Sequence, residues 1–240
     1  MRIAEIWRYP VKSLQGERLD AAHIGEQGVE GDRRWALFDV RTGLGLTARR
    51  HPRLLWASAS LASGSLVITT PDGTTDATSG ALSDWLGWPV ELRAVDDPRP
   101  RRYETAVDPE TERQWEAFDG ARGSFRDSEE SVLSLISTGS LGEWDARRFR
   151  PNIVLDGAGE EDLVGTRVTL GGAVLEVRKR LGRCVLVTRP QPGGIEKDLG
   201  VLRQVHRMHG GSIAIGAGIA STGAVRVGDA LVAAEPVPAW

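Results

Sequence analysis

Short alternating hydrophobic runs, separated by glycine and aspartate clusters, are the feature that most limits how this chain can fold. In the first hundred residues the runs read RIAEIWRYPV, RWALFDV, LLWASASL and SLVITTP. The clusters between them read GEQGVEGD, VRTGLG, ASGS and PDGTT, and such residues favour turns. Alternation over about four to eight residues is typical of a half-buried strand. Many short strands at this spacing indicate a small barrel or sandwich.

The second half of the chain carries the same β pattern with a few helices. We expect strands in SVLSLIS, NIVLD, RVTLGGAVLEVRKR, CVLVTR and VRVGDALVAA. A helix is predicted over Ser79–Leu86, where Gly87 is a stop signal, and a short one in TGSLGEWDARR with Thr138 as its N-cap. The stretch EKDLGVLRQVHRMHG has the apolar spacing of a third helix. The sequence therefore predicts a mainly β fold with few helices.

The segment 96–127 separates two β-rich parts of the chain. It is polar, rich in Arg and Asp, and poor in apolar periodicity, so we expect it to be a long connection. The expected division is an N-terminal β-rich domain over residues 1–95, the connection over 96–127, and a second, barrel-like β domain over 128–240.

Composition and charge exclude several classes of protein. The 240 residues are 40% hydrophobic and 26% charged, as in ordinary globular proteins. The formal net charge of −3 argues against a nucleic-acid binder that relies on overall positive charge. The N-terminus has no apolar secretory region, and no run of about 18 apolar residues predicts a membrane span. A single cysteine without an export signal fits a cytoplasmic protein, and it excludes an internal four-cysteine iron–sulfur cluster.

Three basic and polar clusters lie where predicted strands begin or end. YPVKSLQG places Lys12 and Ser13 after a first strand. GDRRWALF places Arg33 before another, and RRFRPNIVLDG places Arg150 and Asn152 around a proline. Arginine binds phosphate with two parallel hydrogen bonds, lysine acts as a point charge, and asparagine offers both a donor and an acceptor. The clusters suit a polar anionic ligand at one rim of a barrel, with ordinary surface ion pairs as the alternative.

Cys184 is the only cysteine, and it follows Arg183 in the stretch LGRCVLVTRPQPGG. A thiolate is a soft metal ligand, and neighbouring cations favour it over the thiol. A free cysteine also serves as an ordinary small core side chain, so the residue alone leaves both interpretations open. The stretch GAGIAST does not supply a dinucleotide-binding loop, because it lacks the third glycine and a following long helix.

The ordered set YPVKS, GDRRWAL with LTARRHPRL, RFRPNIVLDG and GRCVLVT resembles the molybdenum-cofactor sulfurase C-terminal (MOSC) family. The resemblance covers nearly the whole chain, and its first two pieces look like the N-terminal β-barrel domain of that family. The pattern is most similar to the amidoxime-reducing proteins. It implies a bound molybdopterin, the molybdenum cofactor, whose metal is ligated by Cys184. The matching cofactor contacts are Lys12, Ser13, Arg33, Ser131, Arg150, Asn152 and Arg183, with Arg49 as a secondary contact.

The resemblance also implies a molybdenum-dependent oxidoreductase that reduces N-oxygenated compounds such as hydroxylamines or amidoximes. Electrons are expected from a separate ferredoxin-like or flavoprotein-like partner, and neither nucleic acid nor a membrane is expected as a partner. Two alternatives stay open: a sulfur carrier or cofactor-delivery protein with a persulfide on Cys184, and a binding module that has lost catalysis. Pyridoxal phosphate binding is associated with the family, but no residue of this chain supports it.

The chain departs from this family pattern after Cys184. Amidoxime-reducing members usually follow the RC pair with a TTVDP-TG stretch, whereas this chain continues VLVTRPQPGG. The stretch GGSIAIGAGIA also stands where relatives often carry an aromatic residue near the pocket. We expect these differences to affect substrate handling more than cofactor binding.

Overall fold

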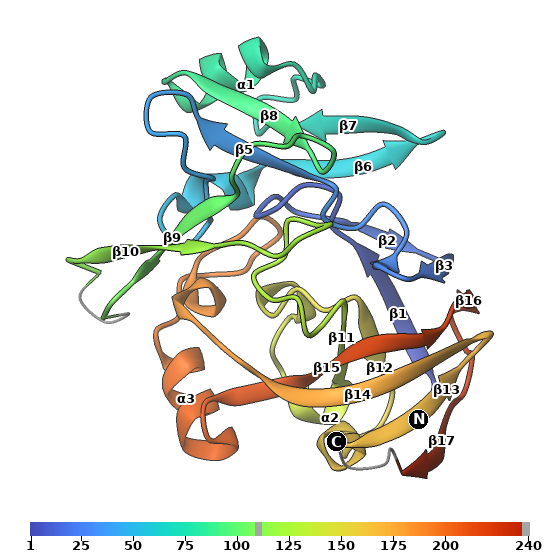
Figure 1. Ribbon diagram of the computed structural model, residues 1–240. Helices are drawn as coiled ribbons and strands as arrows, with labels where there is room; N and C mark the ends of the chain where they lie inside the picture. Colours follow the sequence, from blue (N-terminus) through green and yellow to red (C-terminus); the bar gives the residue numbers. More distant parts are fainter. Residues whose placement is uncertain (109–111, 237–240) are drawn as a thin grey trace.

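A computed structural model describes residues 1–108 and 112–236 of the chain. Its largest unit is an eight-stranded sheet in the order β17-β13-β14-β15-β11-β12-β1-β2, which forms the lower part of Figure 1. All neighbours in this sheet are antiparallel except β11 and β12, which are parallel. Its strands are β1 (Ile3–Arg8), β2 (Glu17–Leu19), β11 (Leu133–Ser137), β12 (Ile153–Leu155), β13 (Thr166–Leu170), β14 (Ala173–Gly182), β15 (Ser212–Ser221) and β17 (Leu231–Pro236).

The first strand of the chain belongs to this large sheet. β1 pairs with β12, and Ile6 lies opposite Ile153. Both side chains are fully buried in one hydrophobic cluster with Leu135 and Leu175. Residues from the expected parts 1–95 and 128–240 therefore share a sheet and a core. The division into two domains stays a prediction.

Smaller sheets form the upper part and one edge of the molecule in Figure 1. β5 pairs with β8, β6 pairs with β7, and β3 lies between β4 and β16. A second buried core, which includes Leu37, Leu54 and Ile68, holds the upper part together. The strands are β3 (Ala21–Gly25), β4 (Gly28–Val29), β5 (Trp35–Asp39), β6 (Ser58–Ala62), β7 (Ser65–Thr69), β8 (Val90–Ala94) and β16 (Gly223–Arg226). The predicted mainly β fold is confirmed.

The segment 96–127, predicted as a long connection, contains a β-hairpin that the sequence pattern does not predict. Its role as the connection between two domains stays a prediction. β9 (Arg102–Ala106) pairs with β10 (Trp115–Asp119), and Tyr103 lies opposite Phe118. Among the residues of these two strands, only Tyr103 is buried. The hairpin therefore leaves no clear alternation of apolar and polar residues in the sequence.

Two of the predicted helices form where expected. α1 (Ser79–Leu86) begins after Thr78, whose hydroxyl accepts a hydrogen bond from the Ala81 N–H. It ends at Gly87, which adopts φ of 91°, as a C-terminal glycine commonly does. α3 (Gly200–His209) follows the predicted apolar spacing. Local capping and spacing signals therefore suffice for these elements.

Three details of the sequence prediction need correction. α2 (Thr138–Leu141) is capped by Ser137, which accepts the Ser140 N–H, so Thr138 is the first helical residue and not the cap. The stretch CVLVTR, expected as a strand, forms the 3-10 turn η4 (Val185–Thr188). Part of LLWASASL likewise forms a 3-10 turn because Pro52 starts it. The 3-10 turns are η1 (Pro52–Trp56), η2 (Ala146–Arg148), η3 (Glu160–Leu163) and η4.

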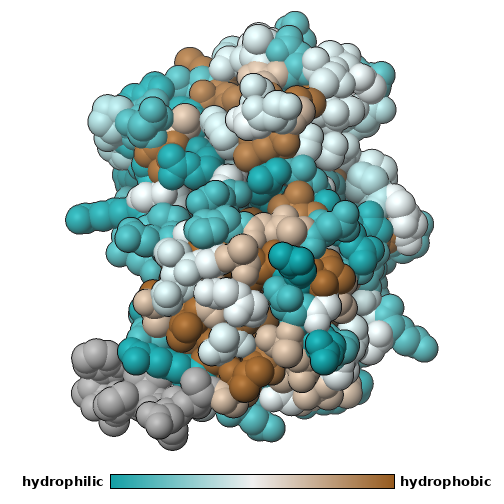
Figure 2. All heavy atoms as spheres, turned by 90° about the vertical axis from the view of Figure 1, so that its right-hand side faces the viewer, coloured by the Kyte–Doolittle hydropathy of each residue, from teal (hydrophilic) through white to brown (hydrophobic). Residues whose placement is uncertain are grey.

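Figure 2 shows hydrophobic side chains in separate groups among hydrophilic ones on the side that it displays. Scattered groups of this kind are normal for a protein surface. Within residues 1–108 and 112–236, no helix combines the length and the apolar character needed to cross a membrane.

Candidate functional site

A cavity of about 560 Å³ is enclosed by segments from both halves of the chain. Its walls come from the turn after β1, the residues before β5 and η1, the segment leading into β11, the residues before β12, and the end of β14. Most of these segments lie at strand ends, where the backbone leaves the sheet and side chains can converge. The fold thus collects polar residues that are far apart in the sequence.

All nine residues that the sequence analysis expected at a site line this cavity. The structure brings them together from the three basic clusters, the residues before β11 and the cysteine motif. Their roles in binding or catalysis stay predictions. They are Lys12, Ser13, Arg33, Arg49, Ser131, Arg150, Asn152, Arg183 and Cys184.

The charge of the cavity wall is strongly positive. Among the described residues that line it, seven are basic and one, Asp127, is acidic. Fixed positive charge in a cleft with low-dielectric walls attracts anionic ligands. The seven are Lys12, Arg33, Arg49, Arg126, Arg148, Arg150 and Arg183.

Three of the expected site residues have an unfavourable backbone conformation. Ser13, Arg33 and Arg150 adopt φ of 70°, 51° and 53°. Side chains other than glycine rarely occupy this left-handed region, and each such residue costs about 1–3 kcal/mol unless its surroundings impose it. Their positive φ values turn the backbone sharply at the cavity wall. Such strain clusters at functional sites, which supports the cavity as the functional centre.

Arg150 and Arg33 lie against one aromatic ring, that of Tyr9. Their guanidinium carbons are 4.3 and 5.0 Å from its centroid. Burial, and then the neighbouring Arg33, lower the pKa of Arg150 to about 10, while Tyr9 opposes this shift. Both terminal nitrogens of Arg150 are buried and have no hydrogen-bond partner among the described residues. Because an unpaired buried donor is costly, an anion that binds Arg150 relieves this cost.

Asp32 is the buried counter-charge of this wall. Its side chain is fully buried, it forms ion pairs with Arg33 and Arg126, and it accepts the Tyr9 N–H at 2.8 Å. Burial by itself favours the neutral acid, but the two arginines and the backbone hydrogen bond outweigh it. The pKa of Asp32 is therefore below its usual value. The carboxylate stays charged and holds the β1 end, Arg33 and Arg126 in place.

Lys12 sits in an unusually cationic environment. Burial lowers its pKa well below the usual value, and Arg49, Arg33 and Arg150 lower it further. Its ammonium donates to the Phe125 carbonyl at 3.0 Å and pairs with Asp127. A second anion beside Lys12 would favour its charged form.

Asp127 bridges two walls of the cavity. Its carboxylate pairs with Lys12 from the turn after β1 and with Arg49 from the loop before η1. The sequence offers no signal for Asp127, because it lies among many Arg and Asp residues with no motif of its own. Arg126 lies in the same polar segment, so the same reason applies to it. Arg148 lies inside the cluster RRFRPNIVLDG, from which only Arg150 and Asn152 were predicted as site residues.

Cys184 lies between β14 and the turn η4, of which it is the N-cap residue, and its side chain is half-buried. The preceding Arg183 donates to the carbonyls of Ile213 at 2.9 and 2.6 Å and of Phe149 at 3.1 Å. Arg148 donates to the Val187 carbonyl at 3.1 Å. These bonds fix the backbone on both sides of the thiol. Burial lowers the pKa of Arg183 to about 10, against the opposing effect of Cys184.

Two polar residues of the site are already engaged with the protein. The Asn152 amide oxygen accepts from the backbone and hydroxyl of Ser134 at 3.2 and 3.1 Å, and its nitrogen donates to the Trp7 carbonyl at 3.3 Å. The Ser13 hydroxyl accepts the Ala48 N–H at 2.9 Å. These hydrogen bonds of Asn152 and Ser13 therefore hold the neighbouring backbone segments of the cavity in place. The hydroxyl of Ser131, by contrast, is buried without a partner among the described residues.

The donor set fits an anionic cofactor that also needs a soft ligand. Arg150 and Ser131 offer unpaired buried donors, and five further arginines and Lys12 surround them. The thiol of Cys184 lines the same cavity. A phosphate group and a metal that prefers sulfur therefore both find suitable partners here.

Family comparisons match both halves of the chain. The family described as MOSC N-terminal beta barrel domain matches residues 1–90, and the family described as MOSC domain matches residues 124–232. Together they cover most of the sequence. The nine expected site residues all fall within these two ranges.

Two curated relatives match most of this chain at low identity. Mitochondrial amidoxime-reducing component 1 from Mus musculus is 25% identical in an alignment of 229 positions that covers 80% of this chain and 67% of that protein. Mitochondrial amidoxime reducing component 2 from Bos taurus is 25% identical in an alignment of 236 positions that covers 83% of this chain and 68% of that protein. Among solved structures, the YuaD protein from Bacillus subtilis is 11% identical with a TM-score of 0.45, and 96% of this chain and 93% of that chain are covered.

Proposed function

Since this chain belongs to the MOSC family, we propose that it binds a molybdenum–pterin cofactor and reduces N-oxygenated compounds with electrons from a separate redox protein. One observation carries the proposal: the only thiol of the chain, Cys184, lines a cavity with seven basic side chains. Anionic cofactor phosphate requires the cations, and molybdenum requires a soft ligand.

The substrate class is inferred from the two relatives. Both are named amidoxime-reducing components. At 25% identity the likeness supports the same kind of reaction more than the same substrate. We propose amidoximes and hydroxylamines as the class because both present an N–O oxygen.

Each wall of the cavity has a proposed task toward the cofactor. Lys12, Arg33 and Arg150 bind the pterin phosphate, and Ser13, Ser131 and Asn152 contribute polar contacts around the pterin. Cys184 binds the molybdenum as its thiolate. The cofactor, when bound, supplies the oxygen-transfer and redox chemistry.

The remaining residues position these groups. Arg183 holds the chain beside the thiol through the carbonyls of Ile213 and Phe149. Asp32 pairs with Arg33 and so orients its guanidinium. Lys12 gains a second anionic partner when phosphate binds, which offsets the repulsion from the surrounding arginines.

The proposal is tested with the Cys184→Ala variant, produced in a host that makes the cofactor. The wild-type protein is expected to carry close to one molybdenum per chain and to reduce an aromatic amidoxime with dithionite-reduced viologen as the electron source. The variant is expected to lose at least about a hundredfold in turnover, because losing one well-placed catalytic interaction typically costs that much. Metal analysis and product formation are the measurements.

Two outcomes separate the proposal from its alternatives. Full turnover with retained metal in Cys184→Ala contradicts the role of the thiol. A one-sulfur mass increase on Cys184 in freshly purified protein, without molybdenum or turnover, favours a persulfide carrier instead.

A further inference from the structure

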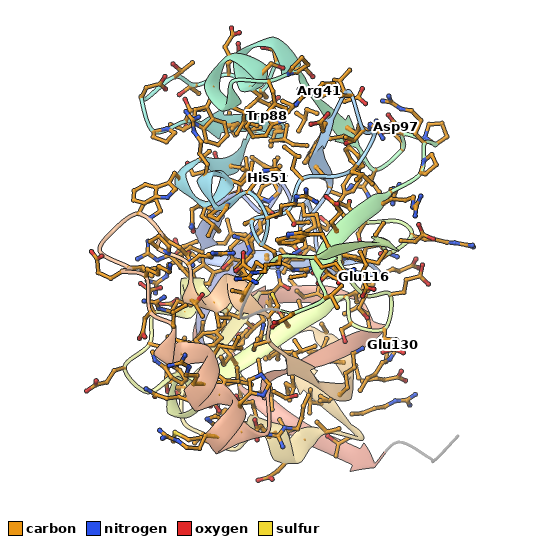
Figure 3. The ribbon with its side chains drawn as sticks, turned by 90° about the vertical axis from the view of Figure 1, so that its left-hand side faces the viewer. Arg41, His51, Trp88, Asp97, Glu116 and Glu130 are labelled. Carbon is orange, nitrogen blue, oxygen red and sulfur yellow. The ribbon has the colours of Figure 1, made fainter. Side chains whose placement is uncertain are left out.

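The β9–β10 hairpin borders the cavity next to the basic wall. Thr105 of β9 is one of the lining residues. Figure 1 shows the hairpin at the level where the upper strands meet the large sheet. Figure 3 shows the molecule from the left-hand side of Figure 1, where the hairpin lies, with Glu116 of β10 labelled. The hairpin therefore forms an outer part of one cavity wall.

Two consecutive arginines hold the body of this hairpin. Arg50 pairs with Glu104 of β9, and its guanidinium lies 5.2 Å from the Trp115 ring of β10. The guanidinium of Arg49 lies 5.6 Å from the Phe118 ring. An isolated two-stranded hairpin is marginally stable, so its position depends on such contacts.

Arg189 holds the hairpin beyond the ends of its strands. Its Nη2 lies 2.6 and 2.5 Å from the two carboxylate oxygens of Glu112, and it also donates to the Arg49 carbonyl at 2.8 Å. The Arg189 side chain is 14% exposed and that of Glu112 is 26% exposed. A charge-assisted contact shielded to this degree contributes more than an open surface pair.

The position of Arg189 in the chain links this contact to the thiol. It follows η4, the turn directly after Cys184, and the backbone N–H of Arg189 donates to the Leu186 carbonyl at 3.1 Å. Arg189 also falls in VLVTRPQPGG, the stretch that departs from the pattern of amidoxime-reducing proteins. The residues that differ from the family pattern therefore include one that contacts the β9–β10 hairpin segment through Glu112.

We propose that Arg189, by holding Glu112, fixes the β9–β10 hairpin as the outer wall of the cavity and so determines how large a molecule reaches Cys184. Under the proposed function this makes Arg189 a specificity-determining residue for the N-oxygenated substrate. It acts through the hairpin and is a positioning residue, because it does not line the cavity itself.

The test uses the full chain purified without cofactor, so it does not depend on molybdenum chemistry. Because Cys184 is the only cysteine, its rate of alkylation reports access to the cavity. We compare N-ethylmaleimide with a maleimide on a bulky polyethylene glycol chain in wild type, Arg189→Gln and Glu112→Gln. Arg167→Gln is the control, because it removes an arginine that pairs with Glu176 on β13 and β14, elsewhere in the fold.

Both hairpin variants are expected to react about tenfold faster with the bulky reagent, since a charge-assisted hydrogen bond holds the wall. Their reaction with N-ethylmaleimide changes less than about twofold, and the control matches wild type with both reagents. The charge-swapped pair Arg189→Glu with Glu112→Arg restores slow labelling. Equal bulky-reagent rates in wild type and Glu112→Gln overturn the inference, even if Arg189→Gln does not fold.

The same comparison separates this inference from the proposed function. If the hairpin variants are labelled faster but the protein never acquires molybdenum, the role of Arg189 is supported and the proposed reductase function is contradicted. If labelling is unchanged in the hairpin variants but the protein reduces amidoximes, the proposed function is supported and the role of Arg189 is contradicted.

Discussion

Asp32 supplies the negative charge that compensates Arg33 and Arg126. It is completely buried, and it is the only carboxylate that either arginine pairs with in the described part of the chain. Removing one partner of a buried ion pair leaves an uncompensated charge in a low-dielectric interior. The folded positions of the Tyr9 backbone and of the Arg33 and Arg126 side chains therefore depend on this carboxylate.

The Asp32→Asn variant is expected to lower the free energy of unfolding by about 3 kcal/mol at pH 7, the usual cost of breaking a buried ion pair. The folded-state pKa of Asp32 is depressed, so its contribution is full above the unfolded pKa of about 4. It is lost as the pH falls through the lower folded value. Urea unfolding of both proteins at pH 7 and below pH 4 measures this. A stability difference that does not shrink in acid contradicts the assignment.

At this scale the sequence identifies the site residues that stand in short motifs at strand ends. Lys12 and Arg150 were found because their clusters combine charge with a proline and a strand. Asp127 and Arg126 were not found, since nothing local distinguishes them from the other Arg and Asp residues of the segment 96–127. Their importance arises from contacts with Lys12, Arg49 and Asp32, which only the folded chain brings together.

In β15, close packing leaves no room for a side chain at one glycine, and nothing in the sequence indicates this. Gly216 lies in the middle of this strand, within the stretch GAGIAST. A Cβ at Gly216 would overlap the Ser131 hydroxyl and lie 2.8 Å from Leu181 Cδ2. Ser131 and Leu181 both line the cavity. Glycine here permits close approach of the cavity wall to the sheet and is not part of a phosphate-binding loop.

Gly216→Ala is therefore expected to lower the free energy of unfolding by about 2 kcal/mol through overpacking. Gly182→Ala at the end of β14 is the matched control, because its nearest non-adjacent atom is the Gly211 carbonyl at 4.0 Å. The control should stay within about 0.5 kcal/mol of wild type. Denaturant unfolding gives both values, and equal stabilities of the two variants refute the packing argument.

Elements with local signals were predicted, and elements defined by distant contacts were not. α1 has a capping threonine and a terminal glycine, and both act as the sequence indicates. The stretch CVLVTR predicts a strand because it is short and mostly apolar, yet it forms the turn η4, since a short apolar run does not by itself distinguish a strand from a tight turn. The β9–β10 hairpin is held by Arg50 and Arg189 from elsewhere in the chain, so its own residues do not predict it.

The whole molecule places its cavity where the two sequence halves meet. Lining residues run from Lys12 to Gly211, so no single part of the chain forms the site. Positive charge gathers there although the net charge of the chain is −3. The net charge of the chain therefore does not reveal the basic cavity, whereas the basic motifs at the strand ends indicate it.

The central claim is that Cys184 binds molybdenum in this cavity. X-ray absorption at the molybdenum edge of the loaded protein tests it most directly, by comparing wild type with Cys184→Ser. We expect one sulfur neighbour fewer around the metal in the variant, because the serine oxygen replaces the thiolate while the pterin sulfurs stay unchanged. An identical number of sulfur neighbours in both proteins would contradict it.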